Sequence, residues 1–222
     1  MQFAEFDALY ANRHETENLI TLQNALLAEF KPDSYGWLWR AARFDHFRAM
    51  QELDNNPDEA RALFEQGAER ARAAEKLEGD RVEAAFWAAT CGLEAARLSG
   101  TFAAGIALGR AQKQLNRAAQ IDESYHFAGP LRVLGRVTHL KPLILGGNLD
   151  YAIAFFERAL QIAPDNSTTL LYYAAALIAD NQPGKARRAL KQIIAAPALE
   201  GWVWESERDR ELARVMTAEK LD

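Results

Sequence analysis

Apolar residues recur at intervals of three and four along most of the chain, and few segments alternate between apolar and polar residues with a period of two. The first spacing places apolar side chains on one face of an α-helix, whereas the second is typical of a strand. The chain is therefore predicted to be all-α. The predicted helices cover residues 16–30, 35–52, 57–77, 81–99, 104–120, 127–141, 148–162, 167–180, 183–196 and 205–219.

The later helices repeat one another. Apolar residues return 34 residues further along the chain, and the aligned pairs are Ala152 with Ala186, Phe156 with Leu190, and Ala159 with Ile193. That spacing is the tetratricopeptide period of about 34 residues, in which two helices form one unit. Because one pair cannot bury its apolar faces alone, we expect a tetratricopeptide-like helical repeat superhelix with a concave groove.

The repeat also predicts the organisation of the chain. We expect a single domain over residues 1–222, with about four helix pairs between a leading and a closing helix. The expected units lie at roughly 35–80, 81–123, 127–164 and 167–200, the leading helix at 16–30 and the closing helix at 205–219.

One unit has an unusual turn. The small residues of its two helices, Gly135 and Ala152, are 17 residues apart, whereas Ala174 and Ala186 of the last unit are 12 apart. The turn that contains the run "LKPLILGGN" is therefore five residues longer than that of the last unit. It contains the three adjacent apolar residues Leu143, Ile144 and Leu145.

A second apolar and glycine-rich stretch, at 99–109, is predicted at the turn of the preceding pair and contains Phe102 and Ile106. Turns of neighbouring units emerge along one edge of a superhelix. We therefore expect the two stretches to form an apolar patch that serves as a subunit contact or as the mouth of a pocket. The alternative is that they pack on each other and cap the core.

Charge and composition exclude several functional classes. The chain has 222 residues, of which 26% are charged, and a net charge of -5 without a block of lysine or arginine, which argues against nucleic-acid binding. The single cysteine excludes an internal disulfide. The four histidines form no metal-spaced pair, and no nucleophile motif or phosphate loop occurs. We predict a non-enzymatic protein without a metal or cofactor.

Three polar residues of the third unit are candidates for the groove. With Gly135 as the small residue of the first helix, Arg132, Arg136 and His139 fall on one stripe that faces the groove. Two guanidinium groups there would bind a carboxylate, either of a small acid or of an acidic partner. The alternative is a solvated helix face or pairing with internal acids.

The earlier units supply aromatic candidates. Trp39 and Arg43 fall at groove positions of the first unit, and Phe86 competes with Trp87 for the corresponding position of the second. Aromatic residues and arginine are common in binding grooves. However, a tryptophan at helical spacing is more often a core residue.

Most of the chain resembles a known family. The segment "FAGPLRVLGRVTHLKPLILGGNLDYAIAFFERALQIAPDNSTTLLYYAAALI" resembles the T-component of tripartite ATP-independent periplasmic (TRAP) transporters. The segments "EAAFWAATCGLEAA", "GWVWESERDRELARVM" and "WLWRAARF" are also similar to that family. The resemblance covers roughly residues 35–215, and its most specific part is 128–166.

The resemblance implies a periplasmic partner of the solute-binding protein of a TRAP system. Family members are expected to form trimers, to hold a small ligand in an apolar pocket and, often, to be lipoproteins. The start "MQFAEFDALY" has neither signal-peptide features nor a lipid-attachment cysteine, which indicates either a trimmed chain or a cytoplasmic protein. The alternative function is a cytoplasmic tetratricopeptide scaffold that binds a peptide or helix of a partner in its groove.

Overall fold

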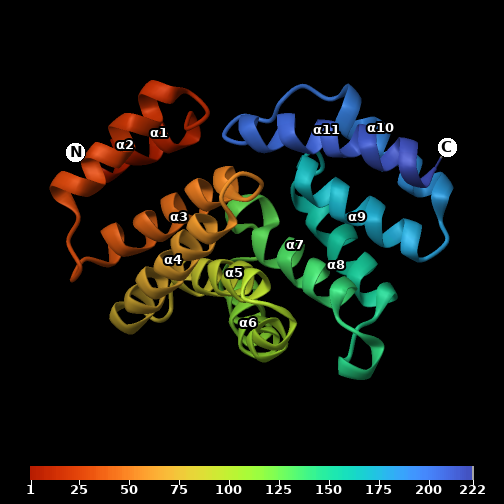
Figure 1. The fold of residues 1–222 in the computed structure, drawn as a ribbon, viewed down its shortest axis with the longest axis horizontal. Helices are drawn as coiled ribbons and strands as arrows, with labels where there is room; N and C mark the ends of the chain where they lie inside the picture. Colours follow the sequence, from red (N-terminus) through yellow and green to blue (C-terminus); the bar gives the residue numbers. More distant parts are fainter. Residues whose placement is uncertain (222) are drawn as a thin grey trace. The chain divides into compact units, whose positions relative to one another are not determined.

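The computed structural model describes residues 1–221, except for the side chain of Leu145, and the secondary structure of this part consists of helices alone (Figure 1). The predicted all-α fold is confirmed. The helices are α1 (Phe3–Ala11), α2 (Thr16–Glu29), α3 (Tyr35–Glu52), α4 (Pro57–Leu77), α5 (Val82–Leu98), α6 (Thr101–Asp122), α7 (Tyr125–Leu140), the short 3₁₀ turn η1 (Leu143–Leu145), α8 (Leu149–Ile162), α9 (Ser167–Ala179), α10 (Pro183–Ala195) and α11 (Val203–Lys220).

The chain divides into two compact units. Unit 1 consists of Met1–Phe6 and Ile20–Tyr125, and unit 2 of Asp7–Leu19 and the residues from His126 onward. In unit 1 each of the helices from α3 to α6 packs on the next, and in unit 2 the same holds from α8 to α11 (Figure 1). Successive antiparallel helices of this kind are the pattern of a tetratricopeptide-like repeat.

Small residues allow the helices of unit 1 to approach closely. A Cβ atom on Gly67 of α4 would lie 3.0 Å from the Sγ atom of Cys91 and 3.2 Å from the carbonyl oxygen of Ala42. Helix α5 buries five alanines along with the large rings of Phe86 and Trp87. Burial also raises the pKa of the Cys91 thiol, so this cysteine is a packing residue.

The aligned residues of the 34-residue repeat form the core of unit 2. Ala152, Phe156 and Ala159 of α8 are fully buried. Ala186 and Leu190 of α10 occupy equivalent buried positions. The small and large residues therefore have the packing role that the repeat predicts.

Helix α7 packs on α8 through a glycine. A Cβ atom on Gly135 would lie 2.6 Å from Cε1 of Phe156, which is closer than two carbon atoms can pack. The small residue that defines the repeat position is thus required by the phenylalanine ring opposite it.

The apolar stretch at 99–109 is a helix and not a turn. Gly100, with φ of 108°, lies between the end of α5 and the first residue of α6, so the link between these helices is very short. The prediction that Phe102 lies in a loop is therefore wrong, because α6 already begins at Thr101. Phe102 and Ile106 lie in its first two turns and are exposed.

The insertion "LKPLILGGN" forms a loop, as predicted. Between α7 and α8 the chain makes the turn η1, and Gly146 follows it in the left-handed conformation. Leu143 and Ile144 are 82% and 93% exposed. The side chain of Leu145, which belongs to the same predicted patch, lies outside the described part of the structure.

The glycine contacts can be tested by matched substitutions. We expect Gly135→Ala to lower the free energy of unfolding by about 1–3 kcal/mol, because the added methyl group would overlap the Phe156 ring. Gly109→Ala is the control, since nothing lies within 4 Å of a Cβ there, and it should raise stability by up to about 1 kcal/mol through helix propensity. Urea unfolding followed by circular dichroism measures both. Equal effects of the two substitutions would contradict the packing argument.

Candidate functional site

Helix α7 begins with three residues in the left-handed conformation. His126, Phe127 and Ala128 have φ angles of 53°, 57° and 56°. For residues other than glycine this conformation costs about 1 kcal/mol or more each. Other contacts must therefore hold the turn.

Arg132 and Trp202 provide those contacts. The guanidinium of Arg132 donates hydrogen bonds to the carbonyl oxygens of Phe127, at 2.9 Å, and His126, at 3.4 Å. The Trp202 ring lies 5.0 Å from the imidazole of His126 and 5.2 Å from the ring of Phe127, and Arg132 stacks on it at 5.0 Å. Arg132 thus fixes the entrance of the helix on which it lies.

Arg132 is buried rather than exposed to the groove. Only 4% of the residue is accessible, and burial lowers the pKa of its guanidinium to about 10. The nearby carboxylates of Glu205 and Asp209 oppose that shift. Its hydrogen bonds go to the backbone, so the structure gives this arginine a structural role.

The acids beside Arg132 are already bonded. The guanidinium of Arg13 lies 2.6 Å from Glu205, and that of Arg208 lies 2.6 Å from Asp209. Ser167 donates a 2.8 Å hydrogen bond to Asp209, which is fully buried. Such buried charges require partners, because an unpaired charge in the interior is strongly unfavourable. These pairs stabilise the fold of unit 2.

Arg136 and His139 lie on the same helix and are half-buried. Arg136 stacks on the ring of Tyr172, with 4.6 Å between the guanidinium carbon and the ring centre. Within residues 1–221 the Arg136 side chain makes no ion pair or hydrogen bond, and the Tyr172 hydroxyl makes no hydrogen bond. Burial and the charge of Arg136 lower the pKa of His139, which keeps the imidazole neutral. Among the described residues, Arg136 thus contacts an aromatic ring and no carboxylate.

The aromatic candidates of unit 1 are mostly core residues. Phe86 is 1% exposed, and its ring packs on Trp87 and Tyr125. Trp39 is 7% exposed, and the guanidinium groups of Arg40 and Arg43 stack on its ring at 4.1 and 4.9 Å. Phe86 therefore does not reach the surface. Trp39 is also mostly buried, and the half-buried Arg43 stacks on its ring.

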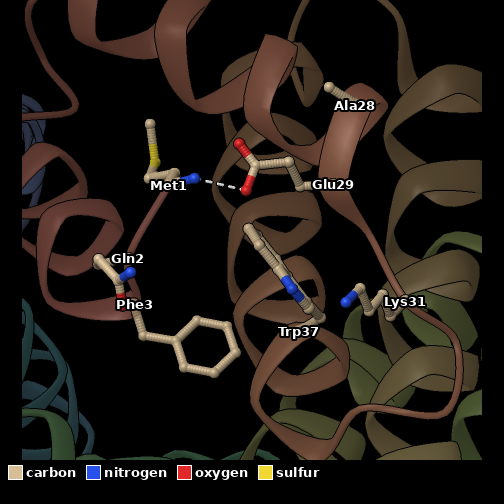
Figure 2. Close-up of a pocket in the computed structure, with 7 residues that line it drawn as sticks. All are labelled: Met1, Gln2, Phe3, Ala28, Glu29, Lys31 and Trp37. Atoms are coloured by element: carbon tan, nitrogen blue, oxygen red, sulfur yellow. Dashed lines mark hydrogen bonds and ion pairs between the residues drawn. The ribbon is translucent and has the colours of Figure 1, made fainter.

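Sequence reasoning did not find a pocket in unit 1 (Figure 2). It has a volume of about 440 Å³ and is lined by Met1, Gln2, Phe3, Ala28, Glu29, Lys31 and Trp37. It was missed because the sequence analysis did not predict helix α1. The apolar pair Phe3 and Phe6 is the signal that could have indicated this helix.

Two simple structural patterns are absent from the part of the chain that the structure describes. None of its helices combines the length and the apolar character needed to cross a bilayer. Nor does this part contain a group of three or more histidine, cysteine, aspartate or glutamate side chains that could hold a metal ion.

The helix pairs and their close contacts define a helical-repeat protein of the tetratricopeptide type. The sequence pattern of the TRAP transporter T-component family matches residues 38–201, and the chain belongs to that family. The solved structures that match include yeast Tom70, with a TM-score of 0.37 and 13% identity over 94% of this chain. The match spans 45% of the Tom70 chain. No curated protein sequence matches.

The different surroundings of the two arginines can be tested. We expect Arg132→Met to lower the free energy of unfolding by about 2–4 kcal/mol, because it removes charged hydrogen bonds to buried carbonyl oxygens. Arg136→Met is the matched control on the same helix and should change stability by less than about 1 kcal/mol. Thermal and urea unfolding of both variants measure the difference. A stable Arg132→Met protein would refute the structural role.

Proposed function

We propose that the protein is a non-enzymatic subunit of a TRAP-type solute uptake system, acts on the periplasmic side, and binds both the solute-binding protein and a small organic ligand. The membership of residues 38–201 in the T-component family carries this proposal. The helical repeat supports it, because stacked helix pairs serve mainly as binding surfaces.

Arg136 is the proposed contact for a carboxylate of the solute-binding protein. Its guanidinium is held in place by Tyr172 and has no acidic partner within residues 1–221. A neutral His139 beside it does not add a second positive charge. A fixed arginine of this kind binds carboxylates with two parallel hydrogen bonds. Arg132, which is bonded internally, is left out of this contact.

Capture of the receptor tests the proposal. The tagged protein should retain a solute-binding protein encoded beside it in the genome, and Arg136→Met should weaken this binding about tenfold, as expected for the loss of a charged hydrogen bond. Arg214→Met is the control, because Arg214 is exposed and already pairs with Glu211 at 2.9 Å. Surface plasmon resonance at two salt concentrations measures the affinities. Equal affinities of both variants would exclude Arg136, and failure to bind the receptor would contradict the proposed function.

The exposed apolar residues of the α7–α8 loop are the proposed contact between subunits of a homotrimer. Leu143 and Ile144 are far more exposed than apolar side chains normally are in a monomer. Phe102 and Ile106, which are 83% and 65% exposed on α6, form a second apolar surface in unit 1. Burial of such residues against another subunit would contribute about 1.5–3 kcal/mol each.

Light scattering tests this assembly. We expect the unchanged protein to have the mass of a trimer and the double variant Leu143→Asp with Ile144→Asp to have the mass of a monomer, because two charges cannot be buried in an apolar contact. Leu27→Asp is the control, since Leu27 is 79% exposed on α2 and lies outside the proposed contact. A monomeric unchanged protein, or a double variant that remains a trimer, would refute the assembly.

A further inference from the structure

The first half of α6 presents an apolar face that no other element of unit 1 covers. Within this unit α6 packs mainly on α5 (Figure 1), and its buried residues, Ala111, Leu115 and Ala118, all lie in its second half. None of residues 101–110 is buried. Phe102 and Ile106, which are 83% and 65% exposed, are four positions apart and so lie on the same side of the helix.

The charges around this face are all positive. The chain has a net charge of -5, yet no aspartate or glutamate occurs in residues 95–121. The charged residues of this segment are Arg97, Arg110, Lys113 and Arg117. A segment with charges of one sign in a chain of the opposite net charge favours a surface that is negatively charged.

Two of these cations have no acidic partner. Arg97 lies 2.8 Å from Glu94, and Arg117 lies 3.3 Å from Glu75, so the nearby acids of α5 and α4 are already paired. Arg110 and Lys113 are exposed and make neither an ion pair nor a hydrogen bond within residues 1–221.

The two unpaired cations continue the apolar row. Arg110 follows Ile106 by four positions and Lys113 follows it by seven, which places all three on one side of α6. The face therefore begins with apolar side chains at the start of the helix and continues with positive charges one and two turns further on.

This order of side chains fits the surface of an anionic lipid bilayer. Apolar residues of a surface helix enter the boundary between headgroups and acyl chains, while its lysine and arginine side chains bind lipid phosphates. Residues 102–109 contain no side chain that forms hydrogen bonds, so their transfer into an apolar medium leaves no polar side chain unsatisfied. The same face of a second copy fits less well, because it would bring the same positive charges together.

We infer that the first half of α6 attaches the protein to an anionic membrane surface. Phe102 and Ile106 enter the headgroup boundary, and Arg110 and Lys113 bind the phosphates. The second half of α6 stays in the core of unit 1, so the helix lies on the membrane and does not cross it. This attachment goes beyond the proposed function, whose receptor contact at Arg136 and subunit contact at Leu143 and Ile144 use other residues.

Vesicle co-sedimentation tests the attachment. The unchanged protein should bind vesicles of equal parts phosphatidylglycerol and phosphatidylcholine at least about tenfold more tightly than vesicles of phosphatidylcholine alone. Arg110→Gln with Lys113→Gln should weaken binding to the anionic vesicles by about tenfold or more, because each cation near such a surface contributes about 1 kcal/mol. Lys185→Gln with Lys191→Gln removes two exposed charges from α10 and is the control that should leave the affinity unchanged.

The apolar part of the contact has its own variants. Phe102→Ser with Ile106→Ser should also weaken binding by about tenfold or more, through the loss of apolar burial. Leu27→Ser is the control, since Leu27 is 79% exposed on α2. All of these side chains are exposed, so the melting temperatures should stay unchanged.

A fluorescent label distinguishes insertion from adsorption by charge alone. Cys91 is buried, so an environment-sensitive thiol dye should react only with the cysteine of Phe102→Cys. Its emission should shift to the blue when anionic vesicles are added, and the dye on Leu27→Cys should show no shift. An unshifted emission at position 102 would contradict insertion.

The remaining outcomes separate a membrane from a protein partner. No binding to anionic vesicles, or equal binding by the Phe102→Ser and Ile106→Ser double variant, would overturn the inference. Loss of receptor capture or of the trimer mass in that variant, with vesicle binding intact, would assign the face to a protein contact instead. If the proposed function fails because no receptor is captured, the vesicle experiments still decide the attachment.

Discussion

Close approach of neighbouring helices is the constraint on which both units depend. In unit 1, Gly67 of α4 leaves room for the Cys91 thiol and for the backbone at Ala42. In unit 2, Gly135 of α7 leaves room for the ring of Phe156. Large and small residues therefore alternate across each contact, which is how helix pairs fill their interior without voids. Since each pair buries its apolar faces only against the next, one enlarged residue affects the stacking of a whole unit.

Burial separates the charged residues into two groups. Arg13, Arg132 and Arg208 are surrounded by carboxylates or carbonyl oxygens in unit 2, and Asp45 in unit 1 lies 2.7 Å from Arg70. Even with that partner, burial raises the pKa of Asp45 to about 7, which shows how strongly the interior opposes its charge. These residues stabilise the fold and are not free to bind. Arg136, by contrast, has no carboxylate or carbonyl partner within residues 1–221 and stacks only on Tyr172.

The sequence predicted what depends on local periodicity and failed where tertiary contacts decide. Most helices, and the burial of Phe156 and Leu190, follow from spacing alone. The burial of Arg132 could not be predicted, because it depends on a left-handed turn stabilised by Trp202, about 70 residues away in the sequence. The prediction that Phe102 lies in a loop was wrong, because Gly100 forms almost the whole link between α5 and α6. The pocket was missed with α1, whose short apolar pattern is weak in isolation.

The segment before the family match is an integral part of both units. Met1–Phe6 belongs to unit 1, where Phe3 forms a wall of the pocket. Asp7–Leu19 belongs to unit 2, where Arg13 donates a hydrogen bond to the Gly201 carbonyl oxygen and pairs with Glu205. Glu205 is 8% exposed, so without Arg13 its carboxylate would lose the cation that compensates its burial. The first helices are therefore needed for the stability of the family's repeat region and also line a pocket outside it.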